Sequence, residues 1–148
     1  MQKLSNQILD LRELEKLATN LCKDISAGDI CLFQGELGAG KTTFIRLLIN
    51  NLYVSNNIPK PSSIISPTYP ILITYELSSS QIYHYDLYRV KNLKELEELD
   101  FFENLNNNIT FIEWPEMLIN LPLNKKHYLI NLDMISETKR KINISFNQ

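Results

Sequence analysis

The feature that most constrains this chain is one short stretch, Gly35-Glu36-Leu37-Gly38-Ala39-Gly40-Lys41-Thr42. It fits the pattern G-x-x-x-x-G-K-S/T of a phosphate-binding loop. All four glycines of the chain lie between Gly28 and Gly40. Such a loop needs glycine because its backbone N–H groups turn inward around an anion, where Cβ atoms would obstruct them. The stretch therefore predicts a site for the β- and γ-phosphates of a nucleotide.

The residues on either side supply the context that this loop requires. The apolar run Ile30-Cys31-Leu32-Phe33 predicts a buried strand before it. Apolar residues after the loop predict a mostly buried helix: Phe44, Ile45, Leu47, Leu48, Ile49 and Leu52. Strand, glycine loop and helix together favour the phosphate site over a plain strand-to-helix turn. We expect the Lys41 ammonium to contact phosphate and the Thr42 hydroxyl to bind Mg²⁺.

Length and composition predict one domain over residues 1–148, with 44% hydrophobic and 22% charged residues. The net charge is −2, and no cluster of basic residues indicates direct nucleic-acid binding. The pair Lys125-Lys126 and the triplet Lys139-Arg140-Lys141 are interpreted as solvated loop and strand ends.

Cys22 and Cys31 are interpreted as small core residues. Nothing resembles a signal peptide or a membrane span, so we expect a cytoplasmic protein without membrane contact.

The rest of the chain predicts alternating strands and helices. Residues 1–9 predict an edge strand or an arm, and Asp10 with Glu13 predicts a capping box at the start of a helix of about four turns. Strands are predicted at 71–76, 81–86 and 109–113, an acidic helix near 93–105, and a closing hairpin at 128–135 and 141–146. This order predicts a three-layer α/β domain with a mixed, partly antiparallel sheet and the phosphate-loop strand at its centre.

Three further segments carry candidate site residues. Residues 53–70 form a long, proline-rich irregular segment containing Ser66-Pro67-Thr68-Tyr69. Thr68 could close over the γ-phosphate as part of a switch, or belong to an ordinary proline turn.

The second segment is the end of the predicted strand at 81–86. Period two places His84, Asp86 and Tyr88 on one face, which suits a polar site. A half-buried histidine beside a surface aspartate is the open alternative.

The third segment is Ile109-Thr110-Phe111-Ile112-Glu113, which has the form of a Walker B strand. The carboxylate that ends such a strand reaches Mg²⁺ directly or through water. Trp114 follows at the carboxyl end of the strand, where open α/β sheets bind ligands.

Taken together, these motifs resemble those of the TsaE (YjeE) family, the small ATPases of bacterial tRNA threonylcarbamoyladenosine biosynthesis. The resemblance rests on the phosphate loop through Thr43, on residues 66–69, on residues 84–89 and on residues 112–115. It implies a P-loop NTPase-like domain that uses ATP and Mg²⁺ and hydrolyses ATP slowly on its own. It also implies docking on the TsaB–TsaD heterodimer, so that contact with tRNA is indirect.

The resemblance also assigns roles residue by residue. It implies catalytic roles for Lys41, Thr68, Asp86 and Glu113, and Mg²⁺ ligation by Thr42 and Glu113. It implies nucleotide binding by Gly35, Glu36, Leu37, Gly38, Ala39, Gly40, Lys41, Thr42, Thr43 and Trp114. The chain departs from the family pattern at Glu36 and Tyr53 and has a longer segment near 55–63, none of which supplies a phosphate or metal ligand.

Two other functions stay open at this point. A P-loop small-molecule kinase needs several lid arginines, whereas this chain has four that are widely spaced: Arg12, Arg46, Arg89 and Arg140. A nucleotide-sensing binding module would bind ATP with negligible turnover. Measuring ATP hydrolysis with and without TsaB–TsaD separates such a sensor from an ATPase.

Overall fold

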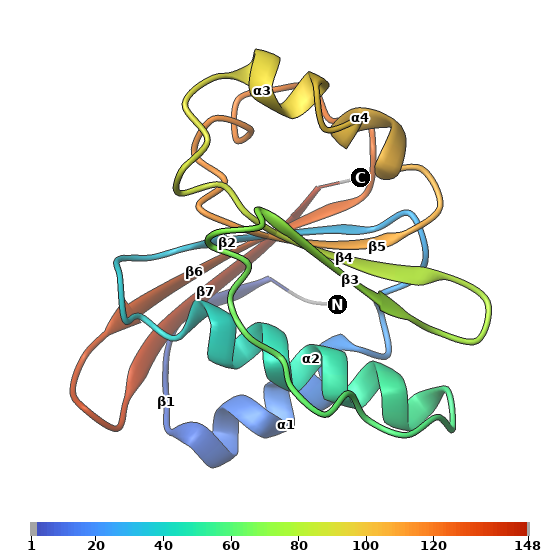
Figure 1. Ribbon diagram of the computed structural model, residues 1–148. Helices are drawn as coiled ribbons and strands as arrows, with labels where there is room; N and C mark the ends of the chain where they lie inside the picture. Colours follow the sequence, from blue (N-terminus) through green and yellow to red (C-terminus); the bar gives the residue numbers. More distant parts are fainter. Residues whose placement is uncertain (1–2, 148) are drawn as a thin grey trace.

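The computed structural model describes residues 3–147 and contains one seven-stranded sheet with helices on both faces (Figure 1). The strands are β1 (Leu4–Leu9), β2 (Ile30–Gln34), β3 (Leu72–Glu76), β4 (Gln81–Asp86), β5 (Ile109–Glu113), β6 (His127–Met134) and β7 (Arg140–Asn147). The helices are α1 (Leu11–Leu21), α2 (Lys41–Ser55), α3 (Leu93–Glu97) and α4 (Phe101–Asn104).

The strand order is β1-β7-β6-β2-β5-β4-β3, which puts the phosphate-loop strand β2 at the centre. β2 is parallel to both of its neighbours, β5 and β6, and β4 is parallel to β5. β3, β7 and β1 are added antiparallel at the two sides. The predicted mixed sheet is confirmed. The apolar run in β2 is explained by helices covering both faces of a parallel sheet centre.

Two separate cores lie on the two faces of the sheet. On one face, α1 and α2 pack against the sheet. The Phe44 ring lies edge-on to the Phe33 ring, with 5.9 Å between the ring centres. On the other face, α3 and α4 cover a core that contains Leu96 and Phe101. The predicted three layers are therefore confirmed, and the carboxyl ends of β2, β4 and β5 stay open between them.

The N-terminal region largely follows its sequence pattern. β1 is an edge strand paired with β7, while the first two residues of the predicted 1–9 segment lie outside the described residues. The Asp10 carboxylate accepts the Glu13 N–H, and the Glu13 carboxylate accepts the Asp10 N–H, which confirms the capping box. The helix ends at Leu21, sooner than predicted.

The two cysteines are free thiols, as expected of core residues. Cys31 is fully buried in β2, and Cys22 is half-buried at the end of α1. Burial raises the pKa of the Cys22 thiol to about 12, so this thiol stays protonated and unreactive at neutral pH.

Two predicted boundaries are wrong. α2 continues through Tyr53 to Ser55, because Leu52 and Tyr53 extend its buried stripe before the first proline at Pro59. The predicted helix near 93–105 is divided into α3 and α4, because Asp100 adopts a left-handed conformation with φ of 52°. Among residues 3–147, none of the helices combines the length and the apolar character that crossing a bilayer requires.

Candidate functional site

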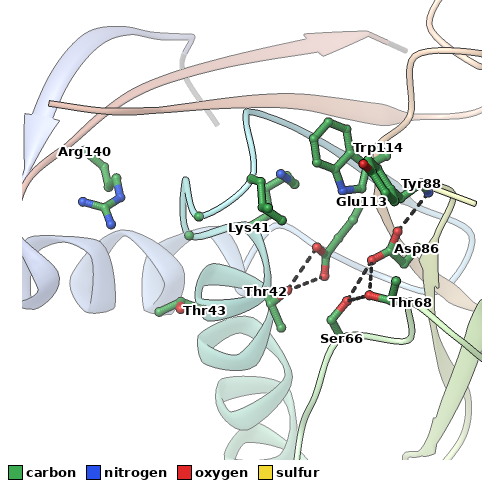
Figure 2. A pocket seen from close by; sticks show the side chains of 13 residues that line it. Lys41, Thr42, Thr43, Ser66, Thr68, Asp86, Tyr88, Glu113, Trp114 and Arg140 are labelled. Atoms are coloured by element: carbon green, nitrogen blue, oxygen red, sulfur yellow. Dashed lines mark hydrogen bonds between the residues drawn. The ribbon is translucent and has the colours of Figure 1, made fainter. Parts of the chain in front are cut away.

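A cavity of about 410 Å³ opens where β2, β4 and β5 end and α2 begins (Figure 2). Its walls come from five segments that are far apart in the sequence. The lining residues are Leu37, Gly38, Gly40, Lys41, Thr42, Thr43, Ser66, Thr68, Asp86, Tyr88, Glu113, Trp114 and Arg140. Most of the predicted site residues thus meet at one place, the carboxyl edge of the parallel strands.

The loop from Gly35 to Gly40 joins β2 to α2, and glycine is required at two of its positions. Gly40 is the N-cap of α2 with φ of 100°, a left-handed conformation that side chains disfavour. At Gly35, with φ of 151°, a Cβ atom would lie 2.4 Å from the Leu132 carbonyl oxygen on β6. The loop can therefore approach β6 this closely only because Gly35 has no side chain.

Gly35→Ala is expected to lower the free energy of unfolding by roughly 2 kcal/mol or more, because the new Cβ displaces backbone on β6. Gly38→Ala is the matched control: its φ of 80° is also positive, but no atom of the described residues lies within 4 Å of the added Cβ. Urea unfolding of both variants measures the difference. Equal losses would mean that the contact with Leu132 is relieved at no cost.

Lys41 is the first residue of α2, and its side chain is only 5% exposed. Its ammonium donates to the Gly35 carbonyl at 2.5 Å and to the Glu36 carbonyl at 3.0 Å, and lies 4.0 Å from the centre of the Trp114 ring. Burial lowers the pKa of Lys41, and the nearby carboxylates of Glu113 and Asp86 oppose this shift. A bound phosphate would place negative charge beside Lys41 and so favour the charged ammonium, which burial disfavours.

Trp114 follows the last residue of β5, and its ring covers Lys41 at the cavity (Figure 2). The ring also packs against Tyr88, with 5.0 Å between ring centres. The Trp114 backbone is left-handed, with φ of 56°, a conformation that is costly for a large residue. This turn directs the ring back over the phosphate loop.

Thr42 and Glu113 are in direct contact at the cavity. The Thr42 hydroxyl lies 2.8 and 3.0 Å from the two carboxylate oxygens of Glu113 (Figure 2). Glu113 is 3% exposed and has a second partner, the His84 Nε2 atom, at 2.8 Å from Oε1. Thr42 thus joins the first turn of α2 to the end of β5.

The donors at this point suit Mg²⁺, which takes oxygen ligands and is held by one or two carboxylates together with substrate phosphates. Within residues 3–147, no group of three or more His, Cys, Asp and Glu side chains is arranged so that it could hold a metal ion. One hydroxyl and one carboxylate beside a phosphate loop fit an ion that binds with a nucleotide. Ligation by Thr42 and Glu113 stays a prediction.

Asp86 ends β4 directly beside Glu113 on β5. Its Oδ2 atom accepts the Ser66 hydroxyl at 2.8 Å and the Thr68 hydroxyl at 3.1 Å, and its Oδ1 atom accepts the Tyr88 N–H at 2.9 Å. The segment around Thr68 is therefore attached to a candidate catalytic carboxylate. Contact between Thr68 and a γ-phosphate stays a prediction.

Strand alternation predicted that His84, Asp86 and Tyr88 share one face. Only His84 and Asp86 lie within β4. His84 is fully buried and Asp86 is 2% exposed, so the alternative of a half-buried histidine beside a surface aspartate is wrong. Tyr88 lies beyond the strand end and is 63% exposed, although its ring borders the cavity. The chain turns after Asp86, which ends the alternation.

Arg140 is the residue that sequence reasoning missed. It was expected at a solvated strand end, whereas its Nε atom donates to the Ala39 carbonyl of the phosphate loop at 2.8 Å. The contact arises because Arg140 begins β7 opposite Met134 of β6, the strand beside β2. No local pattern signals a contact between residues so far apart in the chain. Ser66 also lines the cavity without having been assigned a role of its own.

Comparison with known proteins shows the family to which the chain belongs. The sequence profile of the family described as threonylcarbamoyl adenosine biosynthesis protein TsaE matches residues 8–142. The chain belongs to the TsaE family. It is 43% identical over 135 residues to the tRNA threonylcarbamoyladenosine biosynthesis protein TsaE of Rickettsia felis, covering 91% of this chain and 75% of the relative.

A less similar TsaE aligns with this chain over nearly the whole length of both proteins. The protein of that name from Aquifex aeolicus is 32% identical over 145 residues, covering 97% of this chain and 98% of the relative. The crystal structure of Bacillus subtilis YdiB has a similar fold, with a TM-score of 0.68 and 22% identity over 97% of this chain and 84% of YdiB. The resemblance to TsaE predicted from the motifs is confirmed.

Proposed function

We propose that this TsaE family member is a Mg²⁺-dependent ATPase that serves tRNA threonylcarbamoyladenosine biosynthesis in the cytoplasm. The observation that carries the proposal is the convergence of Lys41, the Thr42–Glu113 pair and Asp86 on one cavity. A phosphate loop, a pair of side chains that can hold Mg²⁺ and a further carboxylate are the parts that ATP hydrolysis requires. The names of the curated relatives support the pathway.

In this proposal the triphosphate occupies the cavity at the ends of β2, β4 and β5, called the first cavity below. Lys41 exchanges its contacts with the loop carbonyls for contacts with phosphate oxygens, and the positive end of α2 faces the same anion. Thr42 and Glu113 would hold Mg²⁺, which would neutralise charge on the phosphates. Asp86, about one strand spacing from Glu113, orients the attacking water through its carboxylate.

A second cavity of about 500 Å³ suits the nucleoside. It shares Gly40, Thr43 and Arg140 with the first cavity, so the two adjoin at the start of α2. Its other walls include the apolar side chains of Leu9, Leu11 and Leu14 together with polar groups. Apolar walls with a few polar groups are typical of sites for a base and its sugar.

The proposed partner is the TsaB–TsaD heterodimer, which the resemblance to TsaE implies. TsaD would transfer the threonylcarbamoyl group to tRNA, so this protein would meet tRNA only through the complex. The kinase alternative is weakened by the arginines: within the described residues, Arg140 alone among them lines the first cavity, while Arg46 and Arg89 bond to the carbonyls of Ile64 and Tyr69. A phosphoryl-transfer lid would need more positive charge.

The test is release of inorganic phosphate from ATP, measured with and without Mg²⁺ and with and without TsaB–TsaD. We expect slow, Mg²⁺-dependent release that the partners accelerate. Unchanged background in the presence of bound partners would support the sensor instead, in which ATP only sets affinity for the complex. Transfer of phosphate to a small molecule in place of water would support the kinase.

A further inference from the structure

We propose that His84 is a positioning residue that orients Glu113 toward Mg²⁺ through a hydrogen bond from Nε2. The inference rests on the proposed function, because it takes Glu113 as the residue that holds the metal. It concerns a side chain that does not line the cavity and contacts neither the phosphate loop nor Thr42 in the described hydrogen bonds.

The contact is short and buried. His84 Nε2 lies 2.8 Å from Glu113 Oε1, and the two side chains are 0% and 3% exposed. Thr42 approaches the same carboxylate from the cavity side. The carboxylate is therefore held between β4 and α2, and its orientation depends on both neighbours.

The geometry also assigns a tautomer to His84. Glu113 accepts the bond, so Nε2 carries the hydrogen. The Nδ1 atom is buried and has no hydrogen-bond partner within residues 3–147.

A role in packing alone does not explain this choice of side chain. The neighbours of His84 along the two adjacent strands are Ile73 and Phe111, so an apolar residue would fit this core. A buried polar atom without a partner is unfavourable, and the fold accepts one at Nδ1. The bond to Glu113 offsets that cost, and groups that orient metal ligands in this way raise metal affinity.

The test uses two variants of similar size, His84→Gln and His84→Asn. The Gln amide nitrogen reaches the position of Nε2, whereas the Asn amide nitrogen reaches only the position of Nδ1. Calorimetry measures ATP affinity with Mg²⁺ and with EDTA. We expect His84→Asn to lose roughly 10- to 100-fold of the affinity gained from Mg²⁺, and His84→Gln to retain most of it. Affinity in EDTA should stay unchanged in both variants.

Equal losses in the two variants, or equal losses with and without Mg²⁺, would overturn the positioning role, because a packing defect does not distinguish them. If wild-type protein binds ATP equally well with and without Mg²⁺, the proposed metal site fails, and the inference with it. If wild type gains affinity from Mg²⁺ and both variants keep that gain, the inference alone fails.

A second measurement does not depend on the variants folding. In wild-type protein with ¹⁵N-labelled histidine, NMR distinguishes the two ring tautomers. We expect a hydrogen on His84 Nε2. A hydrogen on Nδ1 alone would overturn the proposal, because Nε2 could then not donate to Glu113.

Discussion

Lys41→Ala is expected to lose nucleotide binding, ATP hydrolysis or both, by roughly 100-fold or more. The Lys41 ammonium is the cation at the centre of the phosphate loop, held beside the Gly35 and Glu36 carbonyls and disfavoured by burial until an anion arrives. Without this ammonium, the phosphates lose the positively charged side chain that α2 places in the phosphate loop. Calorimetric titration with ATP and a phosphate-release assay measure the two effects separately.

Two further variants make the Lys41 result interpretable. Lys41→Met keeps most of the buried aliphatic stem and removes the ammonium, so a loss in this variant comes from the missing charge. Lys16→Ala removes a lysine that is exposed on α1 and should change neither quantity. Hydrolysis of ATP at the wild-type rate by Lys41→Met would show that the loop does not act on the phosphates.

Asp86→Asn is expected to keep ATP binding within a few-fold and to lose roughly 100-fold or more of hydrolysis. The substitution preserves the shape of the side chain and removes the charge that would orient the attacking water. Asn can also keep the contacts of this site, because its oxygen can accept the Tyr88 N–H while its amide nitrogen donates to the Ser66 or Thr68 hydroxyl. Single-turnover hydrolysis at saturating ATP isolates the chemical step.

The control for Asp86 is thermal unfolding of the same variant. A melting temperature close to that of wild type, with lost hydrolysis, assigns the effect to chemistry. Joint loss of ATP binding and folding stability would instead mean that Asp86 serves only to hold the 66–68 segment and the backbone of Tyr88. Ser66→Ala removes the hydrogen bonds of this hydroxyl to Asp86 and Thr68 while leaving the carboxylate in place, and shows how much the segment contributes.

The parts of the fold that could be predicted are those with strong local patterns. The glycine loop, the buried run in β2 and the Glu113 strand each carry their own signal, and the parallel arrangement brings their ends together. The boundary of α2 was harder to predict, because Tyr53 continues its buried face as well as it could begin a loop.

The contacts that could not be predicted join segments that lie far apart in the chain. Nothing near Arg140 indicates that its guanidinium reaches Ala39, since this depends on the register of β6 and β7. The full burial of His84 is likewise not indicated by the residues around it. Period-two alternation gives the face of a side chain, but its depth of burial depends on which distant elements pack on that face.

The central position of β2 also decides when the site can form during synthesis. β2 and the phosphate loop leave the ribosome early, yet both strands that pair with β2 come much later, at Ile109–Glu113 and His127–Met134. Closing such long loops makes formation of the sheet centre slow, and until then the apolar run of β2 has no partner. A nascent chain that stops before Ile109 thus has the whole loop sequence but no strand to support it. If ATP binds as proposed, it would stabilise only chains that have already paired β2, and would not rescue shorter fragments.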